Sequence, residues 1–122
     1  MTERQSTRTG LVGARVAVTG ADGFIGRHLI RALAQSGARQ IVAIDRRPVV
    51  TNATVPNGSA LVLAGDRSLL EPIDDLLEGV EIVVHLAGRV SPPKSVEDPR
   101  SDAVDNILGT IELLEACRGM GV

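Results

Sequence analysis

Three glycines at regular spacing in residues 16–26, Val-Ala-Val-Thr-Gly-Ala-Asp-Gly-Phe-Ile-Gly, constrain the fold of this chain most strongly. The segment predicts a short apolar strand, a glycine-rich turn and the first turn of a helix. Gly20 suits the positive φ of a sharp turn, Gly23 leaves its backbone open to a phosphate, and Gly26 lets the helix lie close to the sheet. The helix then directs free N–H groups at an anion. Ordinary turns also carry such glycines, so the spacing alone leaves an anion site and a plain turn both open.

Strands and helices alternate along the rest of the chain. The hydrophobic patterns predict strands over residues 15–18, 40–45, 60–64 and 81–86, and helices over residues 24–36, 68–79 and 101–118. We expect the helices to bury Ile25, Leu29, Ala32 and Leu33; then Leu69, Ile73, Leu76 and Leu77; then Val104, Ile107, Leu108, Ile111 and Leu114. This order predicts an α/β fold, a Rossmann-type doubly wound parallel sheet of order 3-2-1-4 that is truncated after the fourth strand and its following helix. A ligand is expected at the carboxyl ends of strands one and four, where the order reverses.

Composition excludes several classes of function. The 122 residues suffice for one domain, and a net charge of −2 without a polybasic cluster argues against nucleic acid and membrane surfaces as partners. With no apolar run that could cross a bilayer and no secretory signal in residues 1–13, we expect a cytoplasmic protein. The single cysteine, Cys117, is interpreted as a buried inert thiol. The motifs of an ATP-binding loop, a metal site and a Ser-His-Asp triad are all missing from the sequence.

A carboxylate at the end of the second strand extends the glycine pattern to a dinucleotide site. Asp45 lies nineteen residues beyond Gly26, near the spacing of a carboxylate that binds the adenosine ribose. Such a group accepts hydrogen bonds from the ribose hydroxyls and repels a 2′-phosphate, which favours NAD over NADP; a solvated loop residue is the alternative. The next two residues, Arg46 and Arg47, are interpreted as solvated side chains, although a guanidinium at this place suits a 2′-phosphate. We keep Arg46 among the candidate binding residues.

Three further positions each allow two interpretations, and one further segment suits a cofactor. Asp66, with Arg67 beside it, is either an ordinary strand-end carboxylate or an acceptor for the adenine amino group. His85 closes the fourth strand, and we interpret it as a structural imidazole bonded to backbone rather than as a catalytic group. Residues 87–89, Ala-Gly-Arg, allow backbone to pass under a cofactor, whereas Asn106 lies either on a helix surface or toward the same cleft.

Four motifs in order resemble one family. Residues 19–26 resemble the T-G-x-x-G-F-I-G signature of the extended short-chain dehydrogenases/reductases, in the NAD-dependent epimerase/dehydratase branch that includes UDP-glucose 4-epimerase-like enzymes. Residues 85–88, His-Leu-Ala-Gly, resemble its H-L-A-[AG] element. Residues 95–99 and 106–116 resemble its S-x-x-x-P and N-x-x-G-T-x-x-L-L-E-A runs.

The resemblance implies an oxidoreductase that moves a hydride between a sugar carbon and the nicotinamide of NAD, on a nucleotide-linked sugar such as UDP-glucose. It also implies a set of cofactor-binding residues: Gly20, Gly23, Phe24, Ile25 and Gly26 at the pyrophosphate, Asp45 at the ribose, Asp66 and Arg67 at the adenine, and Leu86, Ala87, Gly88, Arg89 and Asn106 along the rest of the dinucleotide.

The catalytic Tyr-x-x-x-Lys pair of that family has no counterpart here, because the sequence has no tyrosine and its only lysine is Lys94. We therefore expect a disordered arm over residues 1–13 and a partial NAD(P)-binding Rossmann domain over residues 14–122, inactive alone and without catalytic or metal-binding residues of its own. A non-catalytic NAD(P)-binding module or sensor that works with a partner chain is the alternative. The exposed edge of the fourth strand predicts a homodimer or other self-association.

Overall fold

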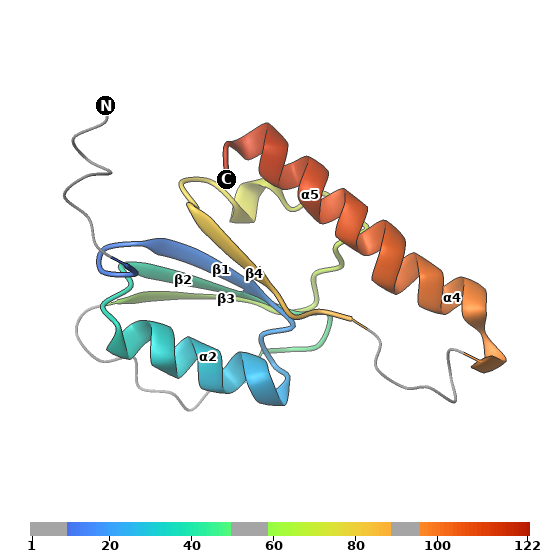
Figure 1. Ribbon diagram of the computed structural model, residues 1–122, viewed down its shortest axis with the longest axis horizontal. Coiled ribbons are helices and arrows are strands. Elements are labelled where there is room, and N and C mark those ends of the chain that lie inside the picture. The colour runs from blue at the N-terminus through green and yellow to red at the C-terminus, as the bar shows by residue number, and fades with distance from the viewer. Residues whose placement is uncertain (1–9, 50–58, 89–95) are drawn as a thin grey trace.

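The computed structural model of the chain describes residues 10–49, 59–88 and 96–122. Its centre is a parallel sheet of β1 (Arg15–Thr19), β2 (Gln40–Ile44), β3 (Ala60–Ala64) and β4 (Ile82–His85), ordered β3-β2-β1-β4 (Figure 1). The predicted α/β fold, the four strands and their order are confirmed. The reversal of order next to β1 brings the carboxyl ends of β1, β2 and β4 together.

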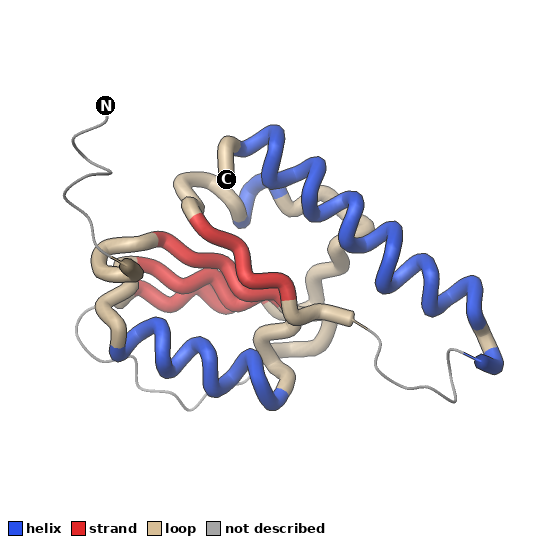
Figure 2. The backbone as a smooth tube through the Cα atoms, in the orientation of Figure 1, coloured by secondary structure: helices blue, strands red, loops and turns tan. Residues whose placement is uncertain are grey.

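Each face of the sheet carries its own core. On one face, Val16 and Val18 of β1 pack with Ile30 and Leu33 of α2 (Phe24–Gln35). On the other face, Ala17 packs with residues that include Leu113 of α5 (Gly109–Met120). Figure 2 shows α2 and the C-terminal helical segment on opposite sides of the strands. β1 is therefore buried on both faces, as its unbroken apolar run predicts.

The buried stripe of α2 differs from the predicted one. Leu33 is buried and Leu29 partly so, as expected, but Ala32 is exposed and Ile25 is 64% exposed, while Ile30 and Ala34 are buried instead. The reason lies at the start of the helix, where Gly26 is buried. Residues three or four positions further along lie on the same side of the helix as Gly26 and are therefore buried with it. Ile25 is left facing outward at the end of the helix nearest the carboxyl ends of the strands.

The helix predicted over residues 68–79 does not form, so this prediction is wrong. Only the short 3₁₀ helix η2 (Asp74–Leu76) forms, although Ile73 and Leu77 are buried as predicted. Pro72 has no N–H and disfavours helical backbone at the residue before it. Its carbonyl accepts a hydrogen bond from Arg67 Nη2 at 3.1 Å rather than from a helical N–H.

The C-terminal helical segment begins earlier than predicted. It comprises α4 (Pro99–Ala103), the π-helical turn η3 (Val104–Leu108) and α5, and is capped by Asp98, whose Oδ1 accepts from Ser101 N at 3.1 Å. The stripe predicted to be buried is wrong: Ile107, Leu108, Ile111 and Leu114 are exposed and Val104 only partly buried.

A second stripe, of small and sulfur-containing residues around one leucine, faces the sheet instead. It consists of Gly109, Leu113, Ala116, Cys117 and Met120. The segment thus carries apolar residues on two sides, and the sheet covers only one of them. Hydrophobicity alone selects the larger residues, whereas close packing here uses the smaller ones.

Two further observations concern the chain outside the sheet. Residues 10–13, the end of the predicted arm, form a turn in which Leu11 packs on the core; the arm over residues 1–9 lies outside the described residues. Among the helices of the described ranges, none combines the length and apolarity needed to cross a bilayer.

Candidate functional site

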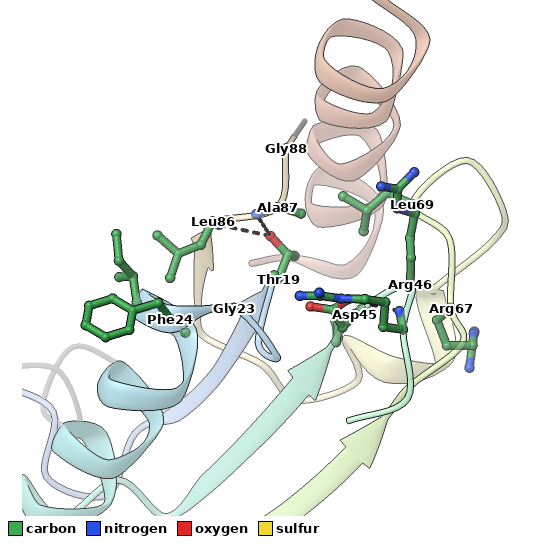
Figure 3. Close-up of a pocket in the computed structure, with 15 residues that line it drawn as sticks. Thr19, Gly23, Phe24, Asp45, Arg46, Arg67, Leu69, Leu86, Ala87 and Gly88 are labelled. Carbon is green, nitrogen blue, oxygen red and sulfur yellow. Dashed lines mark hydrogen bonds and ion pairs between the residues drawn. The ribbon is translucent and has the colours of Figure 1, made fainter. Parts of the chain in front are cut away.

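A cavity of about 660 Å³ opens where β1, β2 and β4 end (Figure 3). It is lined by Thr19, Gly20, Gly23, Phe24, Ile25, Gly26, Ile44, Asp45, Arg46, Arg47, Arg67, Leu69, Leu86, Ala87 and Gly88. Its volume lies within the usual range for small-molecule sites, and its position is the predicted one at the reversal of strand order.

Gly20 forms the bend between β1 and the turn. Its φ is +69°, and a Cβ added there would lie 2.7 Å from Leu86 C and Ala87 N. Gly26 allows a close backbone contact, as expected, but the contact is with the turn and not with a strand of the sheet. A Cβ at Gly26 would lie 2.8 Å from Ala21 Cα. Two glycines thus hold β1, the turn and the loop after β4 at backbone contact.

The N-terminus of α2 points its backbone at this cavity. Gly23 is the N-cap and has no side chain to satisfy the first N–H groups, and the first turn carries no acidic residue. A Cβ at Gly23 would meet only Gly20 O, at 3.3 Å. The arrangement leaves room and hydrogen-bond donors for an anion. Phe24, 79% exposed, forms an apolar rim beside it.

The Asp45 carboxylate is oriented by backbone. Its Oδ2 accepts from Asp22 N at 3.0 Å and its Oδ1 from Arg47 N at 2.9 Å. Each oxygen keeps a second lone pair with which to accept from a ligand hydroxyl. Arg47 is not simply solvated: its Nε lies 3.7 Å from Asp45 Oδ1 and its Nη2 lies 3.8 Å from Asp22 Oδ2.

Arg46 and Arg67 line the cavity while their guanidinium groups engage other carboxylates. Arg46 Nη1 lies 3.3 Å from Asp105 Oδ2, an ion pair that joins the end of β2 to η3. Arg67 donates to both oxygens of Asp75, at 3.1 and 2.8 Å, and in Figure 3 its guanidinium points away from Asp45. This hydrogen-bonded pair raises the pKa of Arg67 and lowers that of Asp75.

Two of the predicted binding residues are not on the cavity wall, and a third is not among the described residues. Asp66 is exposed, with a φ of +55°, and does not line the cavity. Asn106 lies just behind it: its Nδ2 donates to Asp102 Oδ1 at 3.1 Å, and a Cβ at Gly88 would lie 3.3 Å from its Oδ1. Arg89 falls outside the described residues. The binding roles of all the candidate residues remain predictions.

Below the cavity wall, His85 contacts two hydroxyl groups. Its Nδ1 lies 2.6 Å from Thr19 Oγ1 and its Nε2 lies 3.1 Å from Thr110 Oγ1. The interpretation of His85 as a histidine bonded to backbone is therefore wrong about its partners. Burial lowers the pKa of the imidazole. Thr19 itself accepts from Leu86 N and Ala87 N, both at 3.1 Å, as the dashed lines in Figure 3 mark.

Sequence reasoning missed Thr19, Ile44, Arg47 and Leu69 as lining residues. Thr19 and Ile44 are the last residues of β1 and β2, so the rule that ligands lie beyond strand ends at the reversal point would have found them. No comparable signal marks Leu69, whose place depends on a segment with little regular structure.

Two other groups have chemical significance. Cys117 is only partly buried, so its prediction as a buried thiol is wrong in that respect, but this partial burial raises the pKa of the thiol, in keeping with an unreactive side chain. In the described part of the chain, His, Cys, Asp and Glu side chains do not gather in a group of three or more suited to a metal ion.

The chain matches the family model described as "NAD dependent epimerase/dehydratase family" over residues 16–122. It is 43% identical over 75 residues to the ceramide reductase of Caulobacter vibrioides, which covers 62% of this chain and 23% of the relative. It is 34% identical over 119 residues to the UDP-glucose 4-epimerase of Mycolicibacterium smegmatis, which covers 88% and 36%.

Among solved structures, MoeE5 in complex with UDP-glucuronic acid and NAD has a TM-score of 0.76 and 35% identity, over 89% of this chain and 34% of that one. The chain thus spans 23–36% of the length of these relatives. With a family match from β1 to the last residue and a fold shared with a NAD complex, this chain belongs to the NAD-dependent epimerase/dehydratase family.

Proposed function

We propose that this chain is the NAD-binding part of an enzyme that transfers a hydride to and from a nucleotide-linked sugar. The observation that carries the proposal is the cavity at the carboxyl ends of β1, β2 and β4, where a glycine turn and an oriented carboxylate face the same space. The UDP-glucose 4-epimerase and the MoeE5 complex with UDP-glucuronic acid support a nucleotide sugar as substrate class. The ceramide reductase supplies the competing substrate class.

The residues present fit the cofactor. The N-terminus of α2, with Gly23 as its N-cap, suits the pyrophosphate, because no side chain caps its first N–H groups and a Cβ at Gly20 or Gly26 would displace the backbone that shapes the cradle. Asp45 suits the ribose hydroxyls. Arg67 and Leu69 wall the space beyond Asp45, where we place the adenine; a contact from Asp66 stays a prediction.

Asp45 also supports NAD rather than NADP as the cofactor. Its two oxygens are held toward the cavity by Asp22 N and Arg47 N, so a ligand phosphate at the ribose would meet an anion. The Arg46 guanidinium pairs with Asp105 instead of Asp45, and Arg47 Nε, 3.7 Å from Asp45 Oδ1, offsets only part of the carboxylate charge because Arg47 is largely exposed.

Bound NAD supplies the hydride-accepting nicotinamide, and this chain supplies binding and orientation. Proton transfer in the family's chemistry uses a tyrosine, and the sequence has none. We therefore propose that the chain alone binds NAD without turning over substrate. We also propose self-association, because β4 is an edge strand of the described sheet and Ile107, Ile111 and Leu114 are exposed on the C-terminal helical segment. The cytoplasm remains the predicted compartment.

NADH fluorescence tests the cofactor site directly, because a protein without Trp or Tyr contributes little background. We expect saturable binding that Gly23→Val weakens at least about tenfold, since its branched side chain enters the anion space. Gly119→Val is the matched control: Gly119 is exposed in α5 and has open space around its Cβ position. Equal binding by the wild type and the Gly23→Val variant contradicts the proposal.

Ligand-observed NMR on the NAD-loaded chain separates the two substrate classes. A response to UDP-glucose and not to ceramide supports the nucleotide sugar, and the reverse result contradicts it. Light scattering tests self-association: a monomer at about 50 μM, within the micromolar range where exposed edges associate, argues against it.

A further inference from the structure

A continuous set of hydrogen bonds connects the cavity wall to the C-terminal helical segment through β4. Thr19 Oγ1 accepts from Leu86 N and Ala87 N at 3.1 Å each and lies 2.6 Å from His85 Nδ1. On the other side of the ring, His85 Nε2 lies 3.1 Å from Thr110 Oγ1. Leu86 and Ala87 line the cavity, whereas His85 and Thr110 do not.

The far end of this set fixes the direction of every bond in it. Thr110 Oγ1 donates its single proton to the carbonyl of Asn106 at 2.8 Å, so toward His85 it must accept. His85 therefore carries its proton on Nε2 and donates it to Thr110. Its Nδ1 is then an acceptor, which receives the Thr19 hydroxyl proton at 2.6 Å. The two lone pairs of Thr19 Oγ1 remain for the two backbone N–H groups.

We propose that His85, as the neutral imidazole with its proton on Nε2, is a positioning residue that holds the Leu86–Ala87 wall of the cavity through the Thr19 hydroxyl. The proposal rests on the proposed function in that the wall contacts NAD. A proton on Nδ1 breaks the arrangement, because Thr19 has no further lone pair to accept it once both amides are bound. Leu86 N keeps the Thr19 carbonyl, 3.1 Å away, as a second acceptor, so Nδ1–H competes mainly with the Ala87 amide for the hydroxyl of Thr19, a residue that is 1% exposed.

Two of the charged groups on the helical segment beside the ring have partners of their own. Asp105 pairs with Arg46, and Asp102 accepts from the Asn106 side chain. The remaining charged residues of the elements packed against His85 are Arg100 in α4, Arg15 at the opposite end of β1, and Glu112, Glu115 and Arg118 along α5. Burial lowers the pKa of His85 and so favours the neutral ring that the hydrogen bonds require.

The chain provides its own control, because it contains only two histidines. His28 is exposed on α2, and its Nδ1 lies 2.9 Å from the carbonyl of Phe24, to which only Nδ1–H can donate. The two rings are thus expected in opposite tautomers. ¹⁵N NMR of the ring nitrogens distinguishes these tautomers at about pH 7.5, above the ordinary histidine pKa.

The experiment follows the ring nitrogens of both histidines and the amides of Leu86 and Ala87 as the pH is lowered from about 8 to about 5.5, across the ordinary histidine pKa. We expect Nε2–H at His85, and we expect the Ala87 amide to shift with the midpoint of His85, whereas the Leu86 amide, which also donates to the Thr19 carbonyl, shifts less. NADH affinity should fall roughly tenfold over the same range, as for the loss of one hydrogen bond. Nδ1–H at His85, or amides that ignore its titration, overturns the proposal.

Thr110→Val and Thr110→Ser distinguish positioning from general stability. Valine removes the acceptor of Nε2–H, so the share of that tautomer should fall and NADH binding should weaken severalfold; serine should restore both. Unchanged tautomer and affinity in Thr110→Val overturn the proposal. If NADH does not bind at any pH, the proposed function fails, while the ring and amide shifts still decide the role of His85.

Discussion

Replacing Gly20 by alanine tests whether the cavity depends on backbone contact between the turn and the loop after β4. Two costs add at this position. The φ of +69° places a Cβ in the left-handed region, at about 1–2 kcal/mol. The Cβ would also lie 2.7 Å from Ala87 N, a contact that only a backbone shift relieves, at about 1–3 kcal/mol for overpacking. We expect Gly20→Ala to lower the free energy of unfolding by roughly 2–5 kcal/mol.

Gly37→Ala is the matched control. Gly37 has a φ of +86°, but a Cβ there meets Val12 Cγ2 at 3.5 Å, an ordinary contact. Both substitutions restrict the unfolded chain equally, so the difference between them isolates the contact with the loop, about 1–3 kcal/mol. Urea unfolding followed by circular dichroism measures both, since the chain lacks tryptophan. Equal losses in the two variants refute the reasoning, as does retention of NADH binding by Gly20→Ala at wild-type affinity.

Three further predictions concern charge and protonation. Asp45→Asn should lower the preference for NAD over NADP at least about tenfold, as comparison of the two dissociation constants will reveal, because the repelled phosphate no longer meets an anion. Burial lowers the pKa of His85, so stability is fully present above the ordinary value of 6.5 and falls as the pH drops through the folded pKa, since the unfolded chain protonates first. The urea midpoint should therefore decrease less on acidification in His85→Asn, and an equal decrease contradicts this. Cys117 should react slowly with iodoacetamide in the native chain and quickly in urea, because burial raises its thiol pKa; equal rates argue against burial.

The sheet was predictable from the sequence because its signals are local. Each strand is a short apolar run bounded by turn residues, and the alternation with helices determines parallel pairing. The helix faces were not, because they depend on what packs against them. In the C-terminal segment, Ile111 and Leu114 give the stronger hydrophobic signal, yet Gly109 and Leu113 pack on the sheet. A helix with two apolar sides does not reveal from its own sequence which side is covered.

The residues of the candidate site also divide into some that the sequence predicts and some that it does not. Gly20, Gly26 and Asp45 were predictable as a group, because backbone geometry and strand ends fix where they lie. The engagement of Arg67 with Asp75 was not, since it depends on a segment where Pro72 prevents the helix that the pattern indicates. Side chains whose partners come from irregular segments carry no periodic signal.

The polar contact between Thr19 and His85 also explains how the strands find one register. β1 and β4 are apolar along residues 16–18 and 82–84, so burial distinguishes poorly between pairings that slip along the strands. In the observed register Thr19 lies opposite His85. A slip separates the two and leaves the buried Thr19 hydroxyl without His85 as its acceptor, at about 1–3 kcal/mol. The hydroxyl that shapes the cavity wall therefore also selects the strand pairing, which makes the geometry of the wall a consequence of the same contact that aligns the sheet.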